Sequence, residues 1–181
     1  MSDADLLKLA GNQHGYFTTA QAEAVGISRR ALNWRTRQGV VEHVAHGLYR
    51  LGGYPPGARD ELYALQAIIP TAVFSHETAL EAYGLSDVLP STIHLTVPPA
   101  SGLKPRPGVT IHRSELVRTE RVLRDDLWLT TVSRTLLDCA RWGTDLGQLL
   151  AAFEAGHERG MFDPSALARL GQVYPFSGRT D

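Results

Sequence analysis

The residues best suited to chemistry cluster at positions 26–39, GISRRALNWRTRQG, where four arginines accompany one asparagine. A guanidinium group donates two hydrogen bonds to guanine or to a phosphate, and an asparagine amide pairs with adenine. The cluster therefore favours contacts with nucleic acid over acid–base catalysis. A solvated basic face is the alternative interpretation for this stretch taken by itself.

Helical periodicity sorts these side chains. At 100° per residue, Arg29, Asn33 and Arg37 fall on one side of a helix that begins after Ser28. Trp34 is expected on the opposite side, in the core, and Arg35 along the apolar border. The predicted DNA contacts in this helix and the hairpin after it are Ser28, Arg29, Arg30, Asn33, Thr36, Arg37, His46 and Arg50.

The elements around the helix have a recognisable order. The sequence predicts a helix ending near Gly11, a short strand at 15–18, a helix capped by Thr18 or Thr19, and a turn at Gly26. The basic helix follows and ends at Gly39, and residues 40–51 read as a hairpin around Gly47. This is the order of a winged helix-turn-helix.

The segment GGYPPG (52–57) cannot continue a helix or a central strand, so we expect a domain boundary there, between residues 1–53 and 58–181. The second part alternates predicted helices and strands, so the fold class is α+β. Its predicted helices lie at 58–69, 75–85, 145–160 and 163–170, and its predicted strands at 91–99 and 108–116. Within 127–143 the sequence predicts a short strand that enters a helix capped by Thr131 or Ser133.

Seven histidines raise the question of a metal site. None has HExxH or HxH spacing, and the single cysteine, Cys139, excludes a Cys-rich zinc motif. His94 and His112 lie within strand patterns and can pair across a hairpin, which we interpret as structural. We expect no metal site and no cofactor.

Catalytic groups are equally sparse. Asp125–Asp126 resembles a nuclease carboxylate pair, but no lysine follows at short range, and a turn or a helix end is the favoured interpretation. Cys139 lies on an apolar helix face and is expected in the core. No nucleophile–base pair has supporting spacing, so we do not expect an enzyme.

Composition is that of a globular protein, with 43% hydrophobic and 20% charged residues and a formal net charge of -1. Residues 1–53 carry six Lys/Arg and four Asp/Glu, a local charge of +2. No stretch reaches the roughly 18 apolar residues of a membrane span, and no signal peptide is recognisable. We expect a cytoplasmic protein without a membrane partner.

Over about residues 5–160, the chain resembles the AbiEi family of antitoxins from bacterial type IV toxin–antitoxin systems. The most telling pieces are HGLYRL (46–51), SHETAL (75–80) and TTVSRTLLDCA (130–140). The resemblance implies a winged helix that represses its own operon by binding inverted repeats in the promoter. It also implies a C-terminal domain that counteracts a cognate nucleotidyltransferase-type toxin, with or without direct contact.

The resemblance suggests a second basic surface for DNA or toxin, although a solvated surface is an equal alternative. Its candidates are Lys104, Arg106, Arg113, Arg118, Arg121 and Arg124. We expect a monomer or weak dimer that binds DNA as two protomers. A different class of function remains open, in which the winged helix docks a partner protein and the chain acts as an interaction scaffold.

Overall fold

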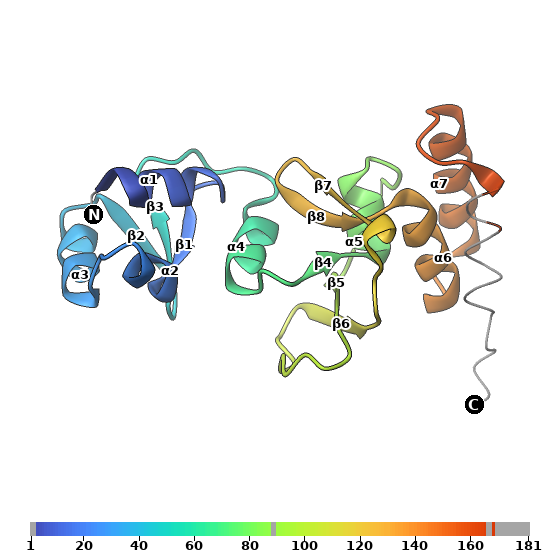
Figure 1. The fold of residues 1–181 in the computed structure, drawn as a ribbon. Coiled ribbons are helices and arrows are strands. Elements are labelled where there is room, and N and C mark those ends of the chain that lie inside the picture. Colours follow the sequence, from blue (N-terminus) through green and yellow to red (C-terminus); the bar gives the residue numbers. More distant parts are fainter. Residues whose placement is uncertain (1–2, 88–89, 166–167, 169–181) are drawn as a thin grey trace. The chain divides into compact units, whose positions relative to one another are not determined.

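The computed structural model describes residues 3–87, 90–165 and 168, and it divides the chain into two compact units, Met1–Thr71 and Ala72–Asp181. Both units mix helices and strands (Figure 1), so the α+β fold class is confirmed.

The N-terminal unit has the element order of a winged helix-turn-helix, as predicted. Three helices and a three-stranded antiparallel sheet in the order β1-β3-β2 make up the motif, and a fourth helix follows. The elements are α1 (Asp3–Gly11), β1 (Tyr16–Thr18), α2 (Thr19–Ala24), α3 (Arg29–Arg37), β2 (Val41–Ala45), β3 (Leu48–Leu51) and α4 (Asp60–Ile68).

Local sequence signals determine where α2 and α3 begin. Thr18 caps α2 in a reciprocal box with Gln21, in which each side chain bonds the other residue's backbone N–H. Ser28 caps α3 by accepting a hydrogen bond from the Ala31 N–H at 3.3 Å. Both caps were predicted from the residue types.

The hairpin β2–β3 is the wing. Gly47 has φ +72° in its turn, a left-handed conformation that glycine adopts without strain. Gly52, just after β3, passes so close to the segment between α3 and β2 that a Cβ there would lie 2.2 Å from the Gly39 carbonyl oxygen. Its N–H donates to the Val40 carbonyl at 2.8 Å. The end of the wing is therefore held against the segment that follows α3, at a position that only glycine fits.

The core of the N-terminal unit joins the three helices to the sheet. It is formed by Leu6, Ala10, Phe17, Ala22, Ile27, Leu32, Val41 and Tyr49. Leu32 is the fully buried residue that α3 contributes to this core, and Ala31 packs against it half-buried. The face of α3 opposite Leu32 is thereby left to solvent.

The compact units divide at a different place from the boundary expected at 52–57. Helix α4 belongs to the N-terminal unit because Ala67 packs with Tyr16 and Leu48 in a second apolar cluster. The proline and glycine residues at 52–57 mark the connection before α4. The compact units, however, are defined by contacts between residues, and these place α4 with the N-terminal unit. Whether residues 1–53 and 58–181 are separate domains stays a prediction.

The C-terminal unit contains a five-stranded sheet in the order β6-β5-β4-β8-β7. Its strands are β4 (Val73–Phe74), β5 (Ile93–Val97), β6 (Val109–Arg113), β7 (Arg121–Arg124) and β8 (Leu127–Thr130). Its helices are α5 (His76–Ala82), the 3-10 helix η1 (Arg118–Glu120), α6 (Val132–Trp142) and α7 (Leu146–Glu158). Helix α5 packs against β5 and β8, α6 packs against α5, and α7 packs against α6.

Strands β5 and β6 pair in parallel, with Thr96 opposite His112, so the hairpin expected for them is wrong. The proline- and glycine-rich segment between the strands, residues 98–108, is long enough to return the chain to the same end of the sheet. Strand β4 inserts between β5 and β8, pairing antiparallel with β5 and parallel with β8.

Two acidic residues form the tight turn between β7 and β8. Asp125 and Asp126 both have positive φ, +48° and +60°, as in the two-residue turns that match strand twist. The turn interpretation of this pair is confirmed. Cys139 is fully buried in α6, as expected for a core residue.

Half of the residues of the predicted helix at 163–170 lie outside the described residues. Among the helices that the structure describes, none is long and apolar enough to cross a membrane.

Candidate nucleic-acid interface

Helix α3 presents a basic face that solvent can reach. Arg29, Arg30, Asn33 and Arg37 are all exposed, and they span about 100° of the helix surface, which suits contact with one groove. The hairpin β2–β3 follows α3 directly in the chain (Figure 1).

The four polar side chains differ in their partners. In the part of the chain that the structure describes, Arg30, Asn33 and Arg37 make no side-chain hydrogen bond or ion pair. The Nε of Arg29 lies 3.1 Å from Oε1 of Glu23 at the end of α2. Because the side chains are 77% and 44% exposed, this pair is weak and exchangeable.

Charge along α3 is arranged unfavourably at one end. Its first turn holds Arg29 and Arg30 and no acidic residue. Cations at a helix N-terminus face the positive end of the helix dipole, which instead favours anions. A phosphate at this end would be stabilised by both arginines, the dipole and the first N–H groups.

Two predicted positions have structural roles on α3. The Ser28 oxygen accepts the capping hydrogen bond, which leaves its hydroxyl hydrogen able to donate to a phosphate. The Thr36 hydroxyl donates to the Leu32 carbonyl at 3.0 Å, within its own helix. Thr36 is half-buried, at the edge of the exposed face.

Arg35 lies along the border of the core, as predicted. Its side chain is 17% exposed, and its guanidinium donates to the Ala31 carbonyl and pairs with Asp3 of α1. This arginine ties α1 to α3 and does not belong to the exposed basic face.

The wing contributes an exposed histidine and a bound arginine. His46 lies exposed in the turn. Arg50 of β3 bonds Glu42 through Nη2 at 2.8 Å and Asp60 through Nη1 at 3.0 Å. The hydrogen bond to Glu42 raises the pKa of Arg50 above its ordinary value. Arg50 therefore holds β2, β3 and α4 together, and DNA contact by Arg50 stays a prediction that requires these pairs to open.

Trp34 was expected in the core, and this prediction is wrong. Its side chain is 58% exposed and adjoins the basic face. Leu32 fills the core position instead, which turns α3 so that Trp34 faces solvent beside Arg30 and Arg37. Val40 and Val44, before and within β2, are also exposed, at 51% and 46%.

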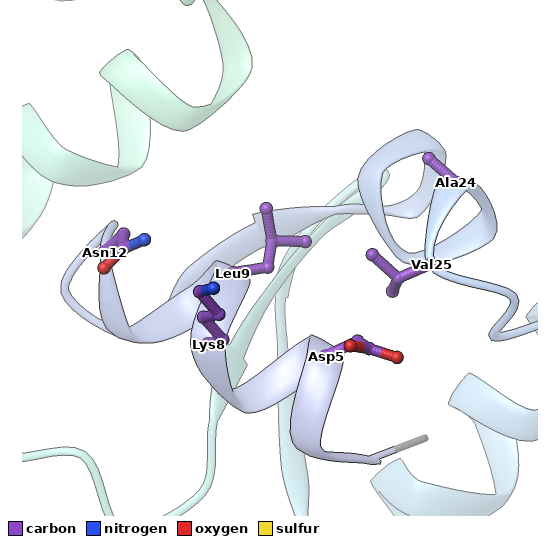
Figure 2. A pocket seen from close by; sticks show the side chains of 6 residues that line it. All are labelled: Asp5, Lys8, Leu9, Asn12, Ala24 and Val25. Atoms are coloured by element: carbon purple, nitrogen blue, oxygen red, sulfur yellow. The ribbon is translucent and has the colours of Figure 1, made fainter. Parts of the chain in front are cut away.

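A shallow pocket in the same unit offers a competing location. Figure 2 shows its lining, which comes from α1 and the end of α2. The lining residues are Asp5, Lys8, Leu9, Asn12, Ala24 and Val25. Its charged groups, Asp5 and Lys8, are exposed, and no residue of the basic face lines it. We therefore place the candidate interface on α3 and the wing.

The candidates for a second basic surface do not form one patch. Lys104 and Arg106 lie in the segment before β6, and Arg113 lies on β6, at one edge of the sheet. Arg121 and Arg124 lie on β7, at the opposite edge.

Three of the six candidates in this second set have partners. Arg113 donates to the Leu103 carbonyl, Arg121 lies over the Trp128 ring, and Arg124 lies over the Tyr83 ring. Arg118 is exposed in η1. The structure thus separates this set into two groups and leaves its role untested.

Comparison with known proteins supports the N-terminal assignment. Residues 4–52 match the model of a family described as a transcriptional regulator, AbiEi antitoxin. The resemblance seen in the sequence is thereby confirmed for this region, which contains the helix-turn-helix and the wing. No curated protein matches the chain.

Proposed function

We propose that this chain is a DNA-binding repressor and the antitoxin of a type IV toxin–antitoxin system. The observation that carries the proposal is the exposed row Arg30, Asn33 and Arg37 on α3, the second helix of a helix-turn-helix. The match of residues 4–52 to AbiEi antitoxin regulators supports the same function.

Helix α3 reads DNA in the major groove in this proposal. Asn33 and Arg37 meet base edges, where amide and guanidinium groups discriminate adenine and guanine. Arg29 and Arg30, at the N-terminal end with Ser28, meet phosphate. His46 in the wing approaches the neighbouring backbone or minor groove.

The size of α3 suggests how the operator is organised. A helix of nine residues covers one short half-site. Two protomers on an inverted repeat in the operon's own promoter would supply the remaining contacts. Repression then follows from occupation of the promoter in the cytoplasm.

The antitoxin role rests on the family match alone. The proposed toxin is a nucleotidyltransferase, and the C-terminal unit is the proposed part that counteracts it. Co-expression of the chain with the product of the neighbouring gene tests this role: growth is expected to recover, and continued growth arrest would contradict it.

DNA binding is tested with the duplex immediately upstream of the gene, by fluorescence anisotropy at several salt concentrations. Arg37→Ala removes a base contact, so we expect a loss of affinity of about 1–3 kcal/mol for the specific duplex only. Arg30→Ala removes a phosphate contact. It is expected to weaken binding to all duplexes and to lower the log–log salt slope by about 0.9.

Lys8→Ala is the matched control, since it removes one exposed charge from α1 in the same unit. Its affinity should fall far less than that of either arginine variant. Wild-type affinity for the upstream duplex in the double variant Arg29→Ala/Arg37→Ala would show that α3 is not the recognition helix.

One observation favours a second function. Trp34, Val40 and Val44 are large apolar side chains exposed near the basic face, and such side chains are typical of protein contacts. The winged helix would then dock a partner protein. Two measurements separate the functions. Docking is supported if the wild type co-purifies with the neighbouring gene product but does not bind DNA, and if Trp34→Ala abolishes that co-purification.

A further inference from the structure

Three histidines meet inside the C-terminal unit. They are His76 at the start of α5, His94 on β5 and His112 on β6. Each offers a ring nitrogen, and the three nitrogens lie within 4.8 Å of one another. We call these residues the histidine cluster.

Sheet pairing explains how two of them meet. His94 and Thr96 point to the same face of β5, because side chains alternate along a strand. The parallel register sets His112 of β6 opposite Thr96, on that face too. Nδ1 of His94 then lies 3.0 Å from Nε2 of His112.

The third histidine comes from the helix that covers this face. Helix α5 is fixed over β5 by two hydrogen bonds: Thr78 Oγ1 accepts from the His94 N–H, and Ser75 Oγ accepts from the Thr96 hydroxyl. His76 adopts φ +51°, a strained conformation for a residue with a side chain. Its ring stacks on that of His112, with centroids 3.6 Å apart.

The cluster is shielded from water. His76 and His94 are 7% and 3% exposed, and His112 is half-buried. Burial lowers the pKa of His76 to about 2 and that of His112 to about 4. The cluster therefore lies inside the unit, with only the His112 ring partly open to solvent.

A pocket beside the cluster contains a second unusual group. His76 and His112 line this pocket together with Asp138 and Arg134. Asp138 is 5% exposed, and its Oδ1 accepts from Arg134 Nε at 2.8 Å. Its Oδ2 is buried and has no hydrogen-bond partner among the described residues. A buried carboxylate oxygen without a partner is costly and indicates a site that takes a polar or charged ligand.

We propose that His76, His94 and His112 bind one divalent transition-metal ion of the zinc class, with a further coordination position open to the pocket. Three imidazoles and one open position form a ligand set that zinc accepts. Two nitrogens bound to one tetrahedral zinc at 2.0–2.1 Å lie about 3.4 Å apart. The separation of 3.0 Å between His94 and His112 is close to this value.

The opposite nitrogens of two rings already have oxygen partners. His76 Nδ1 lies 2.8 Å from Ser75 Oγ, and His94 Nε2 lies 3.4 Å from Thr92 Oγ1. Such partners orient a histidine that binds metal through its other nitrogen. Metal binding replaces the His94–His112 hydrogen bond and rotates His76 off the His112 ring, because ligand lone pairs lie in the ring plane.

An oxyanion fits the cluster less well. The three imidazole rings pack against one another and offer an anion no guanidinium or ammonium group. Arg134 is occupied by Glu120 and Asp138, at 3.1 and 2.8 Å. Arg113 and Arg141 also line the pocket, so inorganic phosphate is included in the test as the competing ligand.

The test uses the untagged full-length protein after treatment with a chelator. Equilibrium dialysis against micromolar ZnCl2, followed by elemental analysis, is expected to give one zinc per chain. Replacing zinc by Co²⁺ is expected to give the visible absorption of a four- or five-coordinate site. Excess ZnCl2, but not MgCl2, should raise the melting temperature.

The His112 ring stacks on His76 and meets Trp142 edge-on. His112→Phe removes the ligand nitrogen but keeps an aromatic ring in this place. This variant should lose the bound zinc and the melting shift. The control His157→Ala alters an exposed histidine of α7 in the same unit and should keep both. Zinc content of His112→Phe equal to that of the wild type would overturn the proposal.

A measurement on the wild type covers the case in which His112→Phe does not fold. X-ray absorption of the zinc-bound protein should show three imidazole ligands. Fewer than three, no bound zinc at all, or a melting shift with inorganic phosphate in place of zinc would each overturn the proposal. DNA binding plays no part in these readouts, so the result is independent of the proposed function.

Discussion

Arg134 and Glu120 form a buried ion pair in the C-terminal unit, with Nη1 of the arginine 3.1 Å from Oε1 of the glutamate. Both side chains are only 4% exposed. Arg134 also bonds Asp138 and the Ser114 hydroxyl, and Oε2 of Glu120 accepts from the Val117 N–H. The arginine thus joins α6 to the segment that leads through η1 into β7.

Replacing Arg134 should be severely destabilising. Arg134→Met leaves the carboxylates of Glu120 and Asp138 buried without their cation, which costs about 3–5 kcal/mol. Urea unfolding followed by circular dichroism measures the loss. Arg118→Met, a change of the same residue type at an exposed position of η1, should alter stability by less than about 0.5 kcal/mol.

A rescue variant separates charge burial from lost packing. Adding Glu120→Gln and Asp138→Asn to Arg134→Met removes the unpaired charges, so part of the stability should return. Equal stability of Arg134→Met and wild type would contradict a structural role for the pair.

In the proposed DNA complex, Glu23 would compete with DNA for Arg29. Glu23→Gln removes the exposed ion pair at 3.1 Å and a negative charge next to α3. Since such pairs are worth about 0.2–1 kcal/mol, DNA affinity should rise by a similar free energy. Anisotropy at low salt with the upstream duplex measures the rise.

The control for this prediction is Glu61→Gln, which neutralises an exposed acid on α4 of the same unit. It should change affinity less than Glu23→Gln does. Weaker binding by Glu23→Gln would contradict the assignment of Arg29 to the interface.

Cys139 should be inert in the folded protein. It is the single cysteine of the chain and is fully buried, and burial raises the pKa of its thiol to about 12. The thiolate is the reactive form. A thiol reagent at pH 8 should therefore label the denatured protein fully, and the native protein only at the rate at which it unfolds around Cys139. Prompt one-to-one labelling of the native protein would contradict the burial.

Residue types with local effects made much of the fold predictable. Thr18 and Ser28 each bond a backbone group three residues away, and Gly47 supplies the positive φ of its own turn. Each of these residues acts on backbone groups only a few positions away. The starts of α2 and α3 and the hairpin of the N-terminal unit can therefore be predicted from the sequence.

Properties that depend on distant partners were harder to predict. Helical periodicity sorts Arg29, Asn33 and Arg37 onto one face, but it does not say which flank the core occupies. Trp34 was therefore assigned to the wrong side. The basic face itself was found because charge and spacing are local.

The histidine cluster was missed for a topological reason. His94 and His112 were noted as a pair, but within a hairpin. The parallel pairing of β5 with β6 and the placement of α5 depend on contacts across the whole sheet. His76 joins the pair only through that packing, and no spacing in the sequence indicates it.

Helix α4 determines where the chain can be cut. It packs Ala67 against Tyr16 and Leu48, and its Asp60 holds Arg50. A fragment that stops at residue 53 would expose those apolar side chains and leave Arg50 with one carboxylate. The shortest fragment suitable for a DNA-binding experiment therefore extends through Thr71, and the shorter one is expected to aggregate.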